Sequence, residues 1–136
     1  MESYGYRFGT ADRTLVIAGD TTPTQATIDV CRGCDVLIHE ASTPARLETR
    51  PDSFQQFAAR YHTTTTELAE LGTKAMLKLL ILDHYASLSP EELQDEMHAF
   101  IQDASWLAET LTCTDLRHPI DAPIVLAVSL RARPCA

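Results

Sequence analysis

Two residues whose side chains could share a metal ion stand just after two apolar runs. Asp20 follows Leu15–Ala18 and a glycine. His84 follows the run Leu79–Leu82 and an aspartate. Such runs predict buried strands, and α/β folds gather ligands at the C-terminal edge of a sheet. Because Zn²⁺ accepts both carboxylate oxygen and imidazole nitrogen, we expect Asp20 and His84 to be metal ligands.

Two further residues have the chemistry needed to move protons. Glu40 ends the apolar run Asp35–Glu40, and His62 precedes four threonines. Side chains alternate along a strand, so His39 and Glu40 must point to opposite faces and only one can face a site. A metal lowers the pKa of its bound water to about 7, and a histidine oriented by a carboxylate suits protonation of a leaving group. Together the four residues are typical of a metallohydrolase.

The elements that would position these residues alternate between strand and helix patterns. In chain order we expect a strand over Tyr4–Phe8, a turn over Gly9–Arg13, a strand over Leu15–Ala18, a helix from Thr22-Pro23 toward Gly33, a strand over Asp35–Glu40, a loop over Ser42–Asp52, a short helix over Phe54–Arg60, a helix opened by a Thr64/Glu67 capping box, a strand over Leu79–Leu82, a helix from Ser89-Pro90 to about Leu107, and a possible last strand over Ile124–Leu130. This alternation predicts a sheet with helices packed against it.

Composition narrows the class of protein. The 136 residues suffice for one domain with a core, and 45% hydrophobic with 22% charged content is typical of a soluble globular protein. A formal net charge of −8 repels phosphate backbones and argues against a primary nucleic-acid clamp. No apolar stretch approaches the roughly 20 residues of a membrane span, and the first residues lack the pattern of a signal peptide. We therefore expect a cytoplasmic protein with no membrane association.

Several residues have a structural interpretation beside the functional one. Asp20 could be the N-cap of the helix near Pro23, and His84 could be a strand-end histidine bonded to backbone. Cys31 and Cys34 match a C-x-x-C spacing, but a structural zinc site needs about four ligands and no second pair stands nearby. For these cysteines we favour a simple position at the end of a helix before a strand.

Four motifs occur in a fixed order over residues 4–97: Gly19-Asp20-Thr21 with Pro23, Asp35–Ala41, His62-Thr63 with Glu67 and Ala69, and Leu82-Asp83-His84. Their joint order and spacing resemble the C-terminal half of metallo-β-lactamase-fold metallohydrolases, in particular the ribonuclease Z (tRNase Z) and arylsulfatase-like branch. The resemblance implies an α/β fold, the C-terminal half of an αββα sandwich in which a mixed sheet is flanked by helices. The half-domain would occupy residues 1–111, and residues 112–136 would form a C-terminal extension with the possible last strand.

The resemblance also implies a role for each site residue. Asp20 would bridge two zinc ions, and His84 would be the last histidine ligand of one of them. Glu40 and His62 would form the carboxylate–histidine pair that protonates the departing alcohol. His39 would keep a structural role on the other face of its strand. The substrate would be an RNA phosphodiester or a small sulfate or other ester.

This sequence departs from the family pattern in one large respect. The family's His-x-His-x-Asp-His motif does not occur, and only 19 residues precede Asp20. We therefore expect part of a zinc-dependent hydrolase that is inactive alone. The alternative is a non-catalytic interaction or regulatory protein that retains the half-fold and dimerises through its exposed sheet. A plain α/β binding domain is a weaker interpretation, because no glycine-rich phosphate loop is present.

Overall fold

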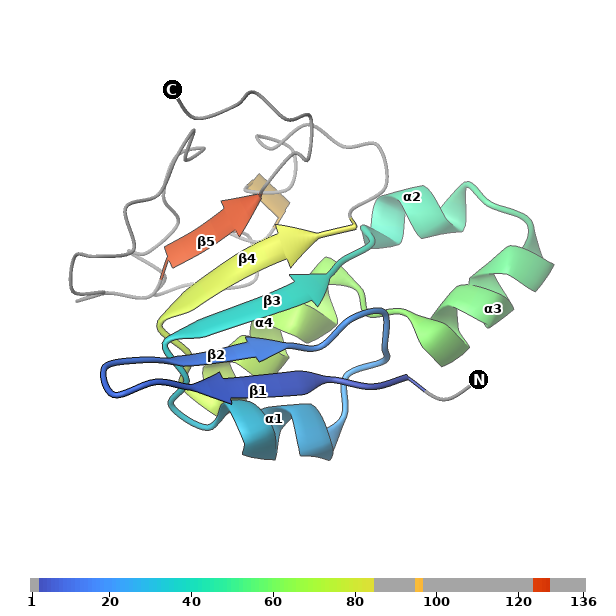
Figure 1. Cartoon of the computed structure of the whole chain (residues 1–136). Coiled ribbons are helices and arrows are strands. Elements are labelled where there is room, and N and C mark those ends of the chain that lie inside the picture. The colour runs from blue at the N-terminus through green and yellow to red at the C-terminus, as the bar shows by residue number, and fades with distance from the viewer. Residues whose placement is uncertain (1–2, 85–94, 97–123, 128–136) are drawn as a thin grey trace, which may run out of the picture.

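A computed structural model describes residues 3–84, 95–96 and 124–127. Its elements are β1 (Tyr6–Gly9), β2 (Thr14–Ile17), α1 (Gln25–Cys31), β3 (Val36–Glu40), α2 (Pro44–Glu48), α3 (Asp52–Tyr61), α4 (Thr65–Ala75), β4 (Leu79–Asp83) and β5 (Ile124–Ala127). Figure 1 shows their arrangement in space. The described part is an α/β structure, as expected.

The described strands form one mixed sheet in the order β1-β2-β3-β4-β5. The β1–β2 hairpin is antiparallel, whereas β2, β3, β4 and β5 run parallel to one another. Parallel neighbours need crossover connections, which α1 supplies between β2 and β3 and α2 to α4 supply between β3 and β4. The C-terminal ends of β2, β3 and β4 therefore meet at one edge of the sheet, beside α2 and α3 (Figure 1).

One face of the sheet is sealed by α1 and α4. Leu37 and Leu80, on the neighbouring strands β3 and β4, are 0% and 1% exposed. Other members of this core are Val16, Ala18, Cys31, Cys34, Ala41, Leu68, Ala69, Leu71, Ala75, Leu77 and Leu82. Burial of these side chains supplies the main driving force for folding and fixes the strands relative to the helices.

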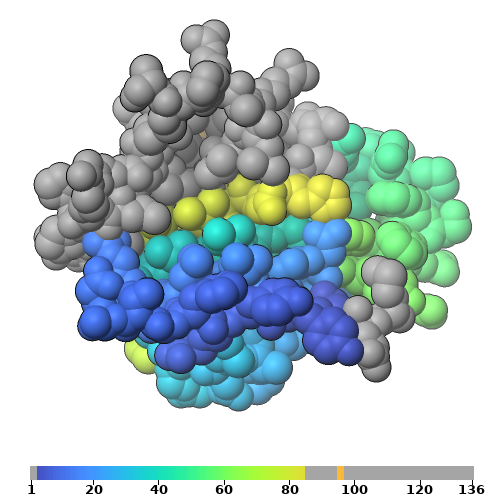
Figure 2. All heavy atoms as spheres, in the orientation of Figure 1, coloured from blue at the N-terminus to red at the C-terminus, as the bar shows by residue number. Residues whose placement is uncertain are grey.

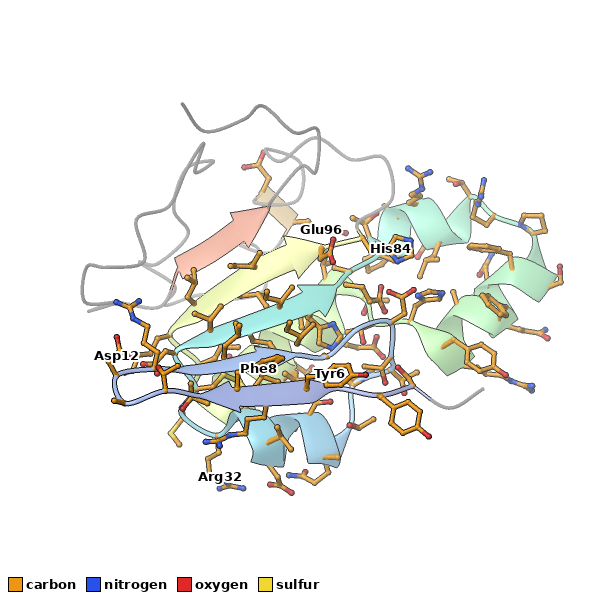
Figure 3. All side chains as sticks on the ribbon, in the orientation of Figure 1. Tyr6, Phe8, Asp12, Arg32, His84 and Glu96 are labelled. Atoms are coloured by element: carbon orange, nitrogen blue, oxygen red, sulfur yellow. A yellow bond between two sulfur atoms is a disulfide. The ribbon has the colours of Figure 1, made fainter. Side chains whose placement is uncertain are left out.

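The opposite face of the sheet is also apolar. Val36 and Leu79 are buried there, with Leu15, Ile38 and Ile81 partly buried beside them. On the edge strand β1, Tyr6 and Phe8 are cross-strand partners of Ile17 and Leu15 and so share this face (Figure 3). In Figure 2 side chains of β1 to β4 form visible surface with no described helix above them. The described part of the molecule is thus one sheet with α1 and α4 on one face and with α2 and α3 beside its C-terminal edge.

The helix expected from Thr22-Pro23 begins later, at Gln25. Thr24 is the N-cap: its backbone is extended (φ −120°, ψ 152°) and its hydroxyl accepts the Thr27 N–H at 3.1 Å. A threonine hydroxyl placed two residues further along satisfies the free helix donor, so the extended segment continues past Pro23. The interpretation of Asp20 as a helix cap is therefore wrong.

The segment expected to be a loop, Ser42–Asp52, contains the short helix α2. Pro44 occupies its first turn, where a missing N–H costs nothing. Thr43 caps it by accepting the Arg46 N–H at 3.3 Å. Two prolines indicated a loop, but one of them starts a helix. The prediction of α3 is confirmed, and that helix is longer than expected.

Cys31 and Cys34 lie where the sequence placed them, at the end of α1 before β3. Their sulfur atoms form a disulfide, and both side chains are within the core at 0% and 1% exposure. The C-x-x-C spacing alone does not predict this bond. A metal-binding interpretation of the pair has no support, because each sulfur is bonded to the other.

Other expectations fall partly or wholly outside the described residues. Of the helix expected from Ser89, only Asp95 and Glu96 are described, and both are helical. The last strand is confirmed over Ile124–Ala127. The domain division at residue 111 stays a prediction. Among the described residues no helix is both long enough and apolar enough to cross a membrane.

The capping box at the start of α4 forms as predicted and offers a test of how that helix is anchored. Thr64 accepts the Glu67 N–H at 3.3 Å, and the Glu67 carboxylate accepts the Thr64 N–H at 2.9 Å. We expect Thr64→Ala to lower the free energy of unfolding by about 1 kcal/mol. Thr66→Ala, on the same helix, should change it by less than about 0.5 kcal/mol. Urea unfolding followed by circular dichroism measures both, and equal losses would contradict the capping role.

Candidate metal and acid–base site

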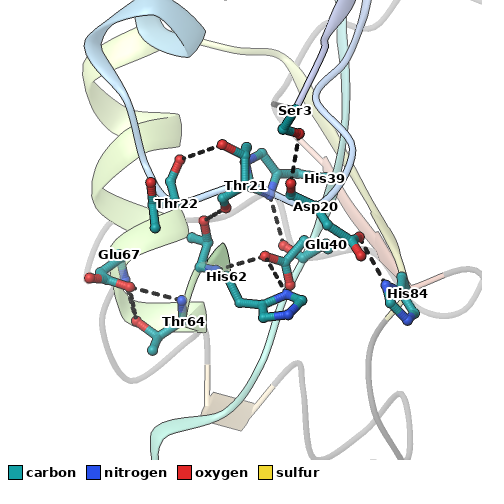
Figure 4. Close-up of polar contacts among 11 residues, drawn as sticks. Ser3, Asp20, Thr21, Thr22, His39, Glu40, His62, Thr64, Glu67 and His84 are labelled. Carbon is teal, nitrogen blue, oxygen red and sulfur yellow. Dashed lines mark hydrogen bonds and ion pairs between the residues drawn. The ribbon is translucent and has the colours of Figure 1, made fainter. Parts of the chain in front are cut away.

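Asp20 and His84 meet at the C-terminal edge of the sheet although 64 positions separate them. Asp20 Oδ1 lies 2.9 Å from His84 Nδ1 (Figure 4). The chain reaches this geometry through two left-handed residues, Gly19 at φ +66° and His84 itself at φ +50°. Glycine adopts that conformation freely, but a histidine adopts it at a cost of about 1 kcal/mol or more. Backbone strain at His84 is of the kind that clusters at functional sites.

The contact is electrostatic as well as geometric. The hydrogen bond to Asp20, and then the charge of Asp20, raise the pKa of the His84 imidazole above its usual range. The two side chains are 43% and 67% exposed, so a ligand can reach both. Asp20 and His84 thus form an accessible carboxylate–imidazole pair.

Glu40 is the last residue of β3 and is almost fully buried, at 2% exposure. Its Oε1 accepts the Thr63 N–H at 2.7 Å and lies 3.4 Å from His62 Nδ1. Burial raises the Glu40 pKa to about 7, an effect that the hydrogen bond from Thr63 partly offsets. A carboxyl group with this pKa exchanges its proton at neutral pH, which suits acid–base chemistry.

His62 stands between two elements that fix its position. Its N–H ends α3 by donating to the Ala58 carbonyl at 2.8 Å, and the next residues start α4. The 3.4 Å separation from Glu40 is an ion-pair distance and is longer than a good hydrogen bond. Catalytic hydrogen bonds often tighten only when substrate binds, so Glu40 and His62 are placed to act together.

His39 lies on the other face of β3, as strand alternation predicts. It is 1% exposed and pairs across the sheet with Leu82, a member of the helix-covered core. Nδ1 is 2.8 Å from the Glu40 backbone carbonyl, so this nitrogen carries the proton that it donates. Burial lowers the His39 pKa, which favours the neutral ring. Its Nε2 is buried without a hydrogen-bond partner in the described part of the chain.

A hollow of about 30 Å³ joins these groups at the sheet edge. It is lined by Ile17, Gly19, Asp20, Ile38, His39, Glu40, Asp83 and His84. His62 is not part of its wall, and Figure 4 shows the His62 and His84 rings on opposite sides of the two carboxylates. The structure therefore brings all four predicted residues to one place, as two pairs: Asp20 with His84, and Glu40 with His62.

The donor types fit zinc, but the number of donors is only half of what zinc needs. Two atoms bound to one tetrahedral zinc at about 2.1 Å lie about 3.4 Å apart, so Asp20 Oδ1 and His84 Nδ1 would have to separate slightly from 2.9 Å. Among residues 3–84, 95–96 and 124–127 no cluster of three or more His, Cys, Asp or Glu side chains could hold a metal. The described residues supply two ligands and no complete site.

Sequence reasoning assigned no role to Thr63, which supports the site through its backbone N–H and its hydroxyl. Thr63 donates its N–H to Glu40, and its hydroxyl donates to the Thr21 carbonyl at 2.5 Å, which ties the α3–α4 junction to the end of β2. Thr63 is fully buried. A threonine inside a run of four gives no sequence sign of this role, because only its tertiary partners distinguish it.

The buried carboxyl predicts a pH-dependent stability of the metal-free protein. The folded chain holds the Glu40 proton up to about pH 7, whereas the unfolded chain releases it near its ordinary value of 4.5. Raising the pH through this window therefore favours unfolding, by up to about 3 kcal/mol. Glu40→Gln should flatten that decline, measured by urea unfolding from pH 4.5 to 7.5 with EDTA present.

The matched control is Glu70→Gln, which neutralises an exposed carboxylate that pairs with Lys74. We expect it to leave the pH dependence unchanged. A pH dependence in Glu40→Gln as steep as that of the unsubstituted chain would show that Glu40 does not contribute, because His84, whose pKa is also raised, adds its own decline in both proteins.

Comparison with known proteins gives partial matches. No family model matches the chain. It is 36% identical over 87 residues to ribonuclease Z of Anoxybacillus flavithermus, which covers 62% of this chain and 25% of that protein. Ribonuclease BN of Escherichia coli is 35% identical over 75 residues, covering 55% of this chain and 23% of that protein. The chain thus spans about a quarter of the length of these relatives.

Among solved structures, the metallo-β-lactamase fold protein YhfI of Bacillus subtilis superposes with a TM-score of 0.57. The alignment covers 91% of this chain and 41% of that protein, at 16% sequence identity. This likeness concerns the fold alone, and it confirms the expected fold class. The chain therefore has a metallo-β-lactamase-type fold in part and is similar in sequence to ribonucleases Z and BN.

Proposed function

We propose that this chain carries one side of the zinc centre of a hydrolase that cleaves RNA phosphodiester bonds. The observation that carries the proposal is the contact of Asp20 with His84 beside the pair of Glu40 and His62, at the end of three neighbouring parallel strands. Similarity to ribonucleases Z and BN supports RNA, among the candidate esters, as the substrate class.

In this proposal Asp20 would be the carboxylate ligand of the zinc centre and His84 its last histidine ligand. Bound zinc supplies an activated water by lowering the pKa of that water to about 7. Full coordination then requires donors from outside the described residues, since each zinc needs about four. Because the sequence has no His-x-His-x-Asp-His motif, we expect no hydrolysis from these 136 residues alone.

Glu40 and His62 would deliver the proton that the leaving oxygen needs. Burial raises the Glu40 pKa to about 7, so the carboxyl can hold and release a proton at neutral pH. The Thr63 N–H fixes Oε1 at 2.7 Å, and His62, 22% exposed, presents its ring between Glu40 and solvent. The buried carboxyl thereby orients the imidazole that would touch the substrate.

A chimera tests the proposed roles directly. The 87-residue matched stretch of the Anoxybacillus flavithermus ribonuclease Z is replaced by the corresponding residues of this chain, so that the missing ligands are present. We expect the chimera to bind zinc and cleave RNA. Asp20→Ala should lower both zinc content and cleavage rate, the latter by about 100-fold or more. Asp29→Ala, an exposed carboxylate paired with Arg32, should change neither.

The proposal would be contradicted if the zinc-loaded chimera with Asp20→Ala cleaved RNA as fast as the unsubstituted chimera. A folded chimera that cleaves no RNA at full zinc occupancy would equally contradict it. Zinc content measured by plasma mass spectrometry and far-ultraviolet circular dichroism identify these cases.

The second candidate is a non-catalytic protein that uses its apolar sheet face to bind a partner or a second copy. It is favoured by Tyr6 and Phe8, which are 62% and 50% exposed on the edge strand β1. It predicts a dimer that Tyr6→Asp with Phe8→Asp converts to monomer. Light scattering after size exclusion measures the mass. A monomer before substitution would rule out a dimer formed through this face.

A further inference from the structure

Aromatic rings line one face of α3 and lead to the acid–base pair. Phe54, Phe57 and Tyr61 are spaced three and four positions apart, so a helix places them on one side. The ring centroids of Phe54 and Phe57 are 6.2 Å apart, and those of Phe57 and Tyr61 are 4.9 Å apart. Phe57 is also 5.8 Å from the His62 ring. We call Phe54, Phe57 and Tyr61 the aromatic ladder.

Packing within the described structure does not account for this ladder. Phe54 and Phe57 are 39% and 47% exposed, and Ala58 is the sole buried residue of α3. In Figure 1, α3 forms the outer end of the described structure beside α2, on the side opposite the turn between β1 and β2. Exposed aromatic side chains on a helix that buries so little indicate a binding surface.

The charges around the ladder differ from those of the chain as a whole. The Arg50 guanidinium carbon stands 4.9 Å from the centre of the Phe54 ring, a cation–π contact. Arg46 is half-buried on α2, and Arg60 is exposed at the end of α3. From Pro44 to His62 the chain has three arginines against two carboxylates, whereas its formal net charge is −8. The segment that carries the ladder thus has a small excess of cations on an otherwise acidic protein, and one of them, Arg50, contacts the Phe54 ring.

We propose that the aromatic ladder stacks unpaired bases of an RNA strand whose reacting phosphodiester lies at Glu40 and His62. This inference rests on the proposed function, because it names the part of the substrate that the same site would hold. Aromatic rings accept any base on their faces, and arginines neutralise the backbone. A base inserted between two rings needs roughly 6.8 Å, two steps of 3.4 Å. The observed spacings are smaller, so the bases would cover the exposed outer faces of the rings.

Fluorescence anisotropy with a defined probe tests the inference. The chain is titrated, in EDTA to prevent cleavage, into 5′-fluorescein octauridylate and into an abasic ribose-phosphate strand of the same length. We expect the base-bearing strand to bind about tenfold more tightly than the abasic one. Phe57→Leu, which keeps an apolar side chain and removes the ring, should weaken octauridylate binding about tenfold and abolish that preference. Phe57→Trp should restore both.

The matched control is Phe8→Leu, an equally exposed phenylalanine on β1, which should leave both affinities unchanged. Circular dichroism verifies that each variant is folded. Equal binding of the base-bearing and abasic strands, unchanged binding by Phe57→Leu, or no RNA binding by the unsubstituted chain would each overturn the inference. So would a change in oligomeric mass on Phe57→Leu with RNA binding unaltered, which would identify a protein interface.

These outcomes are separable from failure of the proposed function. Zinc binding and RNA cleavage are measured on the chimera through Asp20, which does not contact the ladder. If the chain shows no preference for the base-bearing strand while cleavage by the chimera still depends on Asp20, only the base-stacking role of the ladder is rejected. If the preference for the base-bearing strand is retained but the chimera neither binds zinc nor cleaves RNA, the proposed hydrolase function is rejected and the RNA-binding surface is supported.

Discussion

The parallel register of β2, β3 and β4 is the constraint on which the rest of the structure depends. Ile17 pairs with Ile38, and Ile38 pairs with Ile81, so the end of β2 is level with these two residues. The strands β3 and β4 continue together for two residues beyond that level. Each strand then delivers one polar residue within three positions of that level: Asp20, Glu40 and His84. A shift of one residue in any strand would turn its side chains to the wrong face. The leucine core under α1 and α4 holds the register in place.

Burial divides the chemistry of the site between its carboxylates. Asp20 is 43% exposed at the sheet edge and bonds to an exposed histidine, which is the environment of a ligand open to a metal. Glu40 is sealed beneath the α3–α4 junction, where desolvation favours its protonated form. Two carboxylates in one hollow thus acquire different properties from their different depths, which suits the metal-ligand and proton-carrier roles that we propose for them.

Strong local patterns made most of the fold predictable from sequence. The apolar runs at β2, β3 and β4 and the Thr64/Glu67 capping box each have a local cause, and their positions were correct within about two residues. The predicted start of α1 was wrong because Thr24, and not Thr22, caps the N-terminus of the helix. The helix α2 was missed because a proline that opens a helix looks like one that breaks it. The disulfide depends on how close the folded backbone brings Cys31 and Cys34, and the four-residue motif alone does not determine that distance.

The candidate site was also predictable only in part. Asp20, Glu40, His62 and His84 could be named because each stands at a strand or helix end, but their pairing across 64 positions is a tertiary fact. The role of Thr63 and the aromatic ladder depend on burial and exposure, which sequence spacing alone leaves undetermined. The ladder also shows why net charge is a coarse guide to nucleic-acid binding. The chain has a formal net charge of −8, yet the aromatic segment beside His62 has a small excess of arginines.

The central claim is that Asp20 and His84 bind the same metal ion. Anomalous diffraction at the zinc edge, from crystals of the chimera that also carries the missing ligands, tests it most directly. We expect a zinc peak about 2.0–2.2 Å from an Asp20 carboxylate oxygen and from a His84 ring nitrogen. Zinc bound in the chimera without these two residues, with the 2.9 Å contact between Asp20 and His84 left intact, would contradict the claim.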